Sequence, residues 1–339
     1  MKIAIIASPS IPVPPEQYGG IERIIYMLIQ ELNKKGHDIT LFAHPDSKPN
    51  CKLIPYRESK AYNLKDFVKL NLLTSKNRGF DIVHTFGRMN NIAMLMPTGL
   101  VKIVSYQLPP TISQVKKAVL LSKNKSLYFS ACSDYIANQI KPFCDVTTVY
   151  NGVDINEYEF SAEMSLGAPL VFLGRIQHDK GTHIAIEVAK KTGNRLVIAG
   201  NIPNEKLHKE YFDLQINPHI DGKNITYIGP VNNKEKNILL GQAKAFLMPV
   251  TWDEPFGIVM TEALACGTPV IGFKRGAVPE VVTDGFNGFV CDTTEQMIAA
   301  VNNVDSIKRE NCRKILEEKF SSKAIAYQYE QLYKRALKI

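Results

Sequence analysis

The sequence predicts an α/β protein of two domains, each built on a parallel sheet that helices cover on both faces. Three observations support this fold class. Short apolar runs alternate with helical patterns along the chain, which is typical of buried parallel strands and their crossover helices. At 339 residues the chain exceeds the size at which one hydrophobic core keeps growing. Hydrophobic residues make up 45% of it, which is enough material for two cores.

The first half of the chain opens with the apolar run 2–7, which predicts a buried strand. A proline-rich loop leads from it into a helix that has isoleucines and leucines at helical spacing and ends at Gly36, a residue type common just after helices. The turn-rich stretch 148–154 predicts a crossing between domains, so we expect the first domain at 1–152. Further strands in this domain are predicted at 39–43, 82–84, 103–105 and 127–130.

The second half repeats this alternation and is expected to form a domain over 153–323, followed by a last apolar helix at 324–338. The elements predicted in this domain are strand 170–174, helix 181–192, strand 195–199, helix 204–216, strand 224–228, helix 233–243, strand 245–250, helix 257–266, strand 269–273 and a short helix from Pro279.

The formal net charge of +8 is unevenly distributed. Residues 1–152 have 19 lysines and arginines against 10 aspartates and glutamates, whereas residues 153–339 have 22 against 23. The basic half has no nucleic-acid motif, so we expect no nucleic acid partner and favour an anionic lipid surface or a phosphate-bearing acceptor. The stretches 65–78 and 116–125, which mix lysine with leucine and valine, are the candidate lipid contacts. Ordinary lysine-rich solubility explains the same charge equally well.

No apolar run is long enough to span a bilayer, and the first apolar run is too short for the core of a signal peptide. We therefore expect a cytoplasmic protein, with peripheral attachment to the inner face of the membrane as an alternative. The six cysteines are scattered without C-x-x-C spacing, which argues against a zinc site and against a disulfide framework.

Two glutamates separated by seven residues, Glu254 and Glu262, are the most informative feature of the chain. Glu254 is predicted in the loop after an apolar strand, and Glu262 about two turns into the helix that this loop opens. Unpaired backbone N–H groups at the start of that helix, those of Phe256, Gly257 and Ile258, are a natural seat for a phosphate. The arrangement suits a nucleotide sugar, with its diphosphate on the amides and its hydroxyls on the two carboxylates.

Arg175 and Lys180 are the candidate partners of a leaving diphosphate. The arginine follows a predicted strand end, and the lysine stands where the next helix begins. A diphosphate gains negative charge as the glycosidic bond breaks, so two cations placed here stabilise the transition state more than the ground state. They supply the charge that a divalent ion would otherwise provide, and no Asp-x-Asp stands at a strand end, so we expect neither a metal nor another cofactor.

Together with the glutamate pair, the runs 265–271 and 276–280 resemble the glycogen synthase-like retaining glycosyltransferases, family 4. The resemblance covers nearly the whole chain and implies the GT-B fold, in which two Rossmann-like domains face each other across a cleft. It implies that domain 1–152 binds the acceptor, that domain 153–323 binds the nucleotide-sugar donor, and that the last helix, 324–338, packs back onto the first domain. Ligands of such sheets bind at the carboxyl ends of the strands.

The same resemblance assigns roles to single residues. Arg175 and Lys180 match the pair to which diphosphate binding is assigned, and Glu262 matches the ribose-binding glutamate. Glu254 takes the position near the reacting carbon of the donor sugar, where a carboxylate acts either as nucleophile or as stabiliser of an oxocarbenium-like centre. For retaining members the attack is from the front face, and the leaving phosphate oxygen accepts the proton of the acceptor hydroxyl.

Two more segments are assigned to the donor. Gly19 and Gly20 end the first loop, and glycines let backbone amides approach a phosphate without an intervening side chain. In the resembled family this loop meets the donor phosphates, and we expect the same role here. The segment after strand 224–228 matches the one whose backbone reads the base, with Val231 as the candidate contact.

The chain departs from the family pattern at two positions. His84 is predicted at a strand end that faces the cleft, where the usual His-x-His is here His-Thr-Phe, and a structural histidine is the alternative. Gln107 stands where many relatives have a histidine, and glutamine can position a hydroxyl but cannot take its proton near neutral pH. Either proton transfer relies on the donor phosphate, or the acceptor differs. Other polar candidates nearby are Asp134, Arg88 and Asn90.

We therefore predict a retaining glycosyltransferase that moves a hexose from a UDP-, GDP- or ADP-sugar to a hydroxyl of a glycan or lipid acceptor. Two alternatives use the same scaffold, since fold does not fix function. One is a sugar-nucleotide epimerase or glycoside phosphorylase, and the other is a catalytically silent sugar-nucleotide binder. The candidate catalytic residues are Glu254, Arg175, Lys180, His84 and Gln107.

Overall fold

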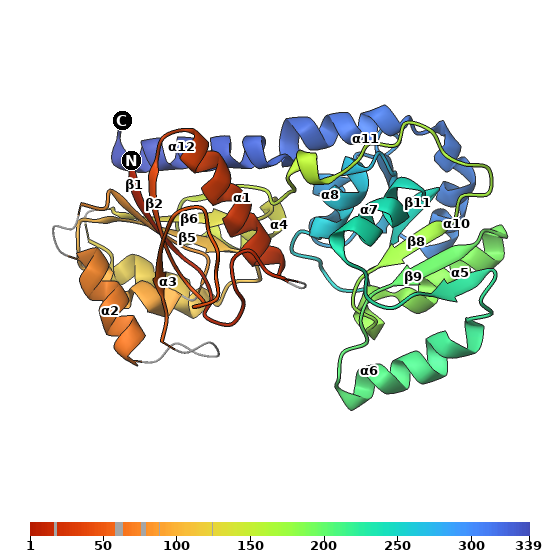
Figure 1. Cartoon of the computed structure of the whole chain (residues 1–339), viewed down its shortest axis with the longest axis horizontal. Helices are drawn as coiled ribbons and strands as arrows, with labels where there is room; N and C mark the ends of the chain where they lie inside the picture. Colours follow the sequence, from red (N-terminus) through yellow and green to blue (C-terminus); the bar gives the residue numbers. More distant parts are fainter. Residues whose placement is uncertain (17–18, 58–63, 76–78, 88, 124) are drawn as a thin grey trace. The chain divides into compact units, whose positions relative to one another are not determined.

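The computed structural model divides the chain into two compact units (Figure 1). Unit 1 is formed by Met1–Asn151 and Ser322–Ile339, and unit 2 by Gly152–Ser321. Each unit contains one fully parallel sheet, with seven strands in unit 1 and six in unit 2. The predicted α/β class with two Rossmann-like parallel sheets is therefore confirmed. The structure describes residues 1–16, 19–57, 64–75, 79–87, 89–123 and 125–339.

The sheet of unit 1 has the strand order β3-β2-β1-β4-β5-β6-β7. Because β1 pairs with β2 on one side and with β4 on the other, the strand order reverses between β1 and β4. The elements are β1 Lys2–Ile6, α1 Gly20–Lys34, β2 Asp38–Ala43, β3 Lys52–Pro55, α2 Leu64–Ser75, β4 Ile82–Thr85, the 3-10 segment Met89–Leu95, β5 Val101–Tyr106, α3 Ile112–Leu121, β6 Leu127–Ala131, α4 Asp134–Ile140 and β7 Val146–Thr148.

The last helix, α12 (Ser322–Leu337), completes unit 1 by packing along α1 (Figure 1). Glu330 on α12 is bound by Lys35 at 2.5 Å and by His37 at 3.6 Å. The apolar side of α12 is buried in the unit, with Tyr329 and Tyr333 almost fully covered. Burial of two large aromatic side chains explains why this helix belongs to the first sheet although it is last in sequence.

The sheet of unit 2 has the order β10-β9-β8-β11-β12-β13, and here the order reverses between β8 and β11. Ligands of doubly wound sheets bind at the carboxyl ends of strands beside such a reversal. The elements are β8 Leu170–Leu173, α5 Thr182–Thr192, β9 Leu196–Ala199, α6 Lys206–Tyr211, β10 Ile225–Tyr227, α7 Asn233–Gly241, β11 Ala245–Met248, α8 Ile258–Ala265, β12 Val270–Phe273, α9 Val278–Val281, β13 Gly288–Cys291, α10 Thr294–Asn303 and α11 Arg309–Ile315.

The helices of the described residues are too short or too polar to cross a membrane. The central strands β1, β4, β8 and β11 are buried almost completely, as expected for strands that helices cover on both faces, whereas the edge strands β3, β7 and β10 are partly exposed. Arg175, Lys180 and Glu254 lie in the segments that follow β8 and β11.

Candidate functional site

The main polar site of unit 2 is built by the loops that follow β8 and β11, the two strands at the reversal of strand order. The loop after β8 carries Arg175, which is exposed, and a 3-10 turn, His178–Lys180. The loop after β11 carries Glu254. These two loops start from neighbouring strands, so they bring side chains that lie far apart in the sequence to one edge of the sheet.

Gly181 allows the two loops to lie against each other. Its φ of 74° is in the left-handed region, and a Cβ atom placed there would lie 2.0 Å from the carbonyl oxygen of Pro249. The N–H of Thr251 also donates to the carbonyl of Asp179 at 2.9 Å. The close contact fixes Lys180 beside the start of the second loop.

Three side chains of these loops meet in what we call the loop triad: Lys180, Trp252 and Glu254. The Lys180 Nζ lies 2.6 Å from Glu254 Oε2, and the indole Nε1 of Trp252 donates to the same oxygen at 3.1 Å. The ammonium also lies 4.6 Å from the centre of the Trp252 ring, in the geometry of a cation–π contact. Among the described residues, Glu254 Oε1 makes no hydrogen bond, so one carboxylate oxygen is held and the other is available.

The backbone of Glu254 is held by the loop after β12. The N–H of Ala277 donates to the carbonyl of Glu254 at 2.8 Å. Gly276 has a φ of 53°, and a Cβ there would lie 2.2 Å from the same carbonyl oxygen. The glycine predicted as part of the family motif is thus needed for the close approach of two loop backbones.

The predicted phosphate seat lies at the start of α8, which begins at Ile258 with Gly257 as its N-cap and no capping side chain. Phe256 is buried and packs against Phe320, with ring centres 5.9 Å apart. Because the helix begins at Ile258, Glu262 lies only about one turn into α8. The prediction of two turns was wrong, since the residues before Ile258 form a loop.

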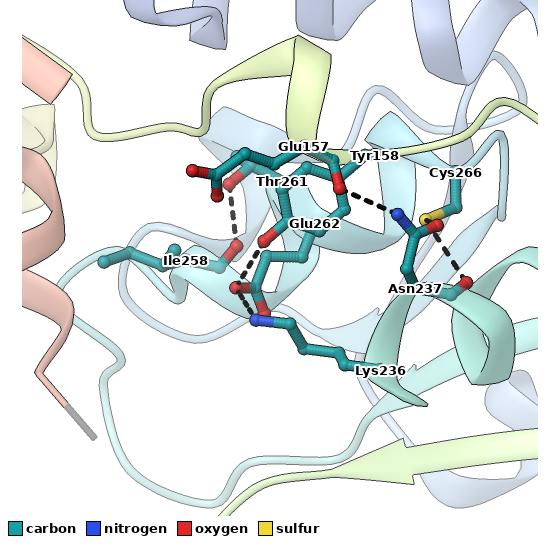
Figure 2. A network of polar contacts seen from close by, with 8 residues as sticks. All are labelled: Glu157, Tyr158, Lys236, Asn237, Ile258, Thr261, Glu262 and Cys266. Carbon is teal, nitrogen blue, oxygen red and sulfur yellow. Dashed lines mark hydrogen bonds and ion pairs between the residues drawn. The ribbon is translucent and has the colours of Figure 1, made fainter. Parts of the chain in front are cut away.

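Glu262 is the centre of a second cluster, the helix triad, with Lys236 of α7 and Tyr158. Figure 2 shows Tyr158 and Lys236 approaching its carboxylate from opposite sides. The Tyr158 hydroxyl donates to Glu262 Oε1 at 2.9 Å, and the Lys236 ammonium pairs with the same oxygen. Only 7% of either charged side chain is exposed, against 15% for Lys180 and 12% for Glu254.

Neighbouring contacts tie the helix triad to the surrounding chain. The Asn237 side chain donates to the carbonyl of Glu157 at 2.8 Å, and the Cys266 thiol lies 3.6 Å from the side-chain oxygen of Asn237 (Figure 2). These bonds join α7, the end of α8 and the segment that carries Tyr158. The geometry of Glu262 is therefore set by three separate parts of unit 2.

Val231 lies between β10 and α7 and is partly exposed. The preceding turn is held by the Gly200 N–H, which donates to the carbonyl of Gly229 at 2.8 Å. The following residue, Asn232, caps α7 and forms a capping box with Glu235. The predicted base-reading segment is thus an ordered turn, anchored at both ends.

In unit 1, Gly19 and Gly20 lie at the start of α1, and Tyr18 of the same motif lies outside the described residues. A Cβ atom at Gly19 would lie 2.6 Å from the Cβ of Pro15, so the proline-rich loop requires a glycine here. Gln107 follows β5 and accepts a hydrogen bond from Asn151 Nδ2 at 2.6 Å.

His84 does not face a ligand site in unit 1. Its side chain is fully buried, with Nδ1 2.7 Å from the Tyr333 hydroxyl and Nε2 2.6 Å from Ser105 Oγ. Burial lowers the pKa of His84 to about 3, so the ring is neutral near pH 7. The expected cleft-facing position is corrected, and the side chain joins α12 to the sheet instead. The alternative of a structural histidine fits, with side-chain partners in place of backbone.

The other polar candidates of unit 1 do not form a cluster with Gln107 among the described residues. Asp134 accepts from Thr148 Oγ1 at 2.5 Å, Asn90 is exposed, and Arg88 lies outside the described residues. Nor do the described residues include a group of three or more His, Cys, Asp or Glu that could hold a metal ion.

Sequence reasoning missed three residues that hold the glutamate pair: Trp252, Lys236 and Tyr158. Trp252 had a signal, since it is the one tryptophan of the chain and stands two residues before Glu254. Lys236 and Tyr158 had none. A lysine in a surface-type helix and a tyrosine in a loop are common. Only the packing of α7 against α8 brings Lys236 to Glu262, and only the path of the segment after residue 157 brings Tyr158 there.

Comparisons with known proteins agree with the geometry. The model of the family "Glycosyl transferases group 1" matches residues 167–327, and that of "Glycosyltransferase Family 4" matches residues 18–157. Spore coat protein SA of Bacillus subtilis (strain 168) is 26% identical, over 93% of this chain and 93% of its own.

Two solved structures share the whole fold. A glycosyltransferase involved in avilamycin A biosynthesis aligns with a TM-score of 0.76 at 23% identity, over 99% of this chain and 98% of its own. Anabaena HepE in complex with UDP-glucose aligns with a TM-score of 0.73 at 17% identity, over 99% and 100%. At these identities the likeness shows the GT-B fold alone.

Proposed function

This chain belongs to the group 1 glycosyltransferases, and on that premise we propose that it moves a hexose from a nucleoside diphosphate sugar to an acceptor hydroxyl with retention of configuration. The observation that carries the proposal is the loop triad. A carboxylate with one available oxygen lies beside Lys180 at the carboxyl ends of β8 and β11, and the exposed Arg175 stands in the same loop as Lys180. Unit 2 is the proposed donor-binding unit.

The diphosphate of the donor is bound by Arg175, Lys180 and the start of α8. An α-helix N-terminus without a capping side chain offers backbone N–H groups and a partial positive charge to a phosphate. In the absence of a donor, Lys180 pairs with Glu254. Once a diphosphate is present, it competes with Glu254 for the ammonium.

Glu254 acts on the sugar itself. Its available oxygen accepts hydrogen bonds from sugar hydroxyls, and its negative charge stabilises the positive charge that develops at the reacting carbon. As the bond from that carbon to the phosphate oxygen breaks, its electron pair goes to the diphosphate. The acceptor oxygen attacks from the same face and passes its proton to the leaving phosphate oxygen, so no histidine is required.

The remaining roles rest on the resemblance to the family. It assigns Glu262 to the ribose hydroxyls and the backbone around Val231 to the base. It also assigns Gly19 and Gly20 to donor phosphate and suggests Gln107 for positioning an acceptor hydroxyl. Because Anabaena HepE was solved with UDP-glucose, UDP is the first nucleotide to test.

No divalent metal is required in this proposal, because Arg175 and Lys180 neutralise the leaving group. Treatment with EDTA followed by gel filtration should therefore leave the rate of nucleotide release unchanged within about twofold. A loss of activity that Mg²⁺ or Mn²⁺ restores would overturn this part of the proposal.

We also propose that α3 attaches the protein to anionic lipid. Leu120 and Leu121 are 84% and 53% exposed, although both are large and apolar. Lys116 and Lys117 on the same helix are exposed too, and the sequence has no acidic residue between Asp81 and Asp134. Exposed leucines beside unbalanced lysines fit an interface of acyl chains and anionic headgroups.

Flotation with vesicles tests the attachment. Binding to vesicles that contain phosphatidylglycerol is expected at low salt, weaker binding at moderate salt, and loss of binding in the double variant Leu120→Ser/Leu121→Ser. A double variant Leu207→Ser/Leu214→Ser, which removes exposed leucines of unit 2, is the matched control. Equal flotation of both double variants, or none for the wild type, would refute the attachment.

Alanine variants of the loop triad test the transferase proposal. Glu254→Ala and Lys180→Ala should abolish nucleotide release in the presence of acceptor while the thermal unfolding midpoint stays near that of the wild type. Retained transfer in both variants would refute the assignment.

Incubation of the donor without acceptor, followed by NMR, tests the epimerase alternative, which predicts a new sugar epimer. Donor binding without turnover on a broad acceptor panel would identify a silent binder.

A further inference from the structure

Trp252 stands at the centre of the loop triad, between β11 and α8. It is the one tryptophan of the chain, and it is only partly buried. Most partly buried tryptophans contribute apolar contact, but this one also directs its indole N–H to a carboxylate oxygen, 3.1 Å away. Lys180 contacts the same oxygen of Glu254, so this oxygen has two donors.

The two donors on Glu254 Oε2 differ in charge. Lys180 is a cation, and in the proposed reaction it is also a ligand of the diphosphate. Trp252 is a neutral donor with no second partner among the contacts of the described residues other than the Lys180 ammonium over its ring. When a diphosphate draws the ammonium toward itself, the indole N–H is the donor that stays on the carboxylate.

We propose that Trp252 is a positioning residue that holds Glu254 in place while Lys180 moves from the carboxylate to the donor diphosphate. The inference rests on the proposed function, since it presumes a diphosphate that competes for Lys180. A side chain such as Glu254, which is mostly buried, is costly to leave without hydrogen bonds, and a carboxylate that rotates away would lose its alignment with the sugar.

A neutral donor suits this role better than a second cation. It orients the carboxylate but does not cancel its negative charge, and that charge is what stabilises a positive reacting carbon. The ring face adds a second effect. Because the ammonium lies 4.6 Å from the ring centre, it can shift toward a phosphate while it keeps favourable contact with the same aromatic face.

Two substitutions separate the N–H from the ring. Trp252→Phe keeps an aromatic face and removes the donor, whereas Trp252→Leu removes both. We expect Trp252→Phe to lower kcat roughly ten- to hundredfold, the usual effect of losing a hydrogen bond to a charged group, with the donor KM changed less than about threefold. Trp252→Leu should lower kcat as much and also weaken nucleoside diphosphate binding by roughly threefold or more.

The matched control is Tyr128→Phe, which removes one long hydroxyl contact, 3.4 Å to the carbonyl of Ala336, in unit 1. It should leave kcat and KM unchanged. A purely structural role of Trp252 predicts instead that Trp252→Phe lowers the unfolding midpoint and changes kcat and nucleotide affinity together. That result, or a kcat within twofold of the wild type, would overturn the inference.

Fluorescence of the wild-type protein gives a readout independent of activity, because all tryptophan emission comes from Trp252. UDP, which has a second phosphate, should change the emission more than UMP at equal saturation, since it shifts the Lys180 ammonium across the face of the indole ring. In Lys180→Ala the two nucleotides should produce equal changes. Equal changes in the wild type would contradict the movement of Lys180.

Calorimetry distinguishes a failure of the proposed function from a failure of the role inferred for Trp252. If neither UDP, GDP nor ADP binds the wild type, the proposed function fails and the inference fails with it. If one of them binds and transfer is measured, but Trp252→Phe retains the wild-type kcat, only the role of Trp252 is refuted.

Discussion

Glu254 and Glu262 each lie in a cluster with one lysine and one aromatic residue, but different elements of the fold form the two clusters. In the loop triad, Lys180 and Trp252 both contact one oxygen of Glu254. In the helix triad, a lysine and a tyrosine likewise share one oxygen of Glu262. In both clusters the lysine also lies near the face of the aromatic ring.

The difference lies in what holds each triad and how much of it solvent reaches. The loop triad is formed by two loops at the reversal of the sheet, and the exposed Arg175 belongs to one of these loops. The helix triad is formed by α7, α8 and the segment that carries Tyr158, and its charged side chains are about half as exposed. We therefore propose a catalytic role for the loop triad, whose ion pair can exchange partners, and a positioning role for the helix triad. Substitutions in the first should cost activity, and substitutions in the second should cost stability.

The largest expected effect is on activity in the loop triad. Glu254→Gln keeps the shape of the side chain but removes its charge, so kcat should fall about 10³-fold, equivalent to about 4 kcal/mol of transition-state stabilisation. The free energy of unfolding should fall less than when a charge is removed from the helix triad, because the loop pair is more exposed. Steady-state kinetics and urea unfolding measure both. A kcat reduced by less than tenfold would contradict the catalytic role proposed for the loop triad.

The next largest effect is on stability in the helix triad. Lys236→Met leaves the buried Glu262 carboxylate without its cation, and the free energy of unfolding should fall by about 3 kcal/mol or more. Lys180→Met, the matched change in the loop triad, should cost less than Lys236→Met, because its pair is more exposed and Trp252 still donates to Glu254. Urea unfolding followed by circular dichroism measures these changes.

Adding Glu262→Gln to Lys236→Met sharpens this prediction. The double variant removes both charges, so it should recover much of the stability lost in the single variant. Equal unfolding free energies of the single and double variants would show that the loss came from packing and not from an unpaired carboxylate.

Tyr158→Phe should have a smaller effect. It removes one hydrogen bond to a carboxylate that Lys236 still neutralises, so the free energy of unfolding should fall by about 1.5 kcal/mol. The donor KM should rise while kcat stays close to that of the wild type, because Glu262 is assigned to ribose binding. A large loss of kcat in Tyr158→Phe, as expected for Trp252→Phe, would remove the distinction between the triads.

The smallest expected effect concerns His84, whose side chain is buried in unit 1. The pKa of His84 is lowered by burial from 6.5 to about 3 in the folded protein, so the unfolded chain binds a proton that the folded chain does not. The stabilisation is complete above pH 6.5 and is lost as the pH falls toward 3. Between pH 6.5 and 5.5 the free energy of unfolding should fall by about 1 kcal/mol through this group.

The His84→Gln variant provides the comparison for this pH effect. Glutamine does not titrate, so the variant should lose that share of the pH dependence and leave the rest, including that of His37, whose pKa burial also lowers. The Tyr333 hydroxyl contacts Nδ1 of His84, and the Tyr329 ring packs against the imidazole. Both hydroxyls stay protonated in this range, since burial raises the pKa of both tyrosines. Identical slopes in the wild type and the variant would refute the assignment.

The sequence predicted the two sheets and most of the loops that carry the unit 2 site, because apolar periodicity and motif spacing are local signals. It missed the edge strands β3, β7 and β13 and the helices α2, α3, α4, α10 and α11. Residues of β13 and α10 belong to the core of unit 2, so packing stabilises these two elements. Short elements at the edge of a sheet have weak local patterns, so their boundaries depend on tertiary contacts.

The candidate site residues also differ in whether a local sequence pattern predicts their position. Glu254, Lys180 and the glycines could be proposed from the sequence because they lie within motifs, and the structure pairs Lys180 with Glu254. His84 was misplaced because a histidine at a strand end has the same sequence pattern whether it faces solvent or the core. Its burial is decided by Tyr333 of α12, which is 249 residues away in the chain. A contact between residues so far apart in the sequence produces no pattern in the local residue spacing.

The central claim is that Lys180 binds the donor diphosphate at the loop triad. Isothermal titration of UDP, or of GDP or ADP if that nucleotide binds more tightly, into the wild type and into Lys180→Ala tests it most directly. The account predicts binding to the wild type and an affinity reduced at least about tenfold in the variant, as expected for loss of a charge-assisted contact to phosphate. Equal affinity in the two proteins would contradict it.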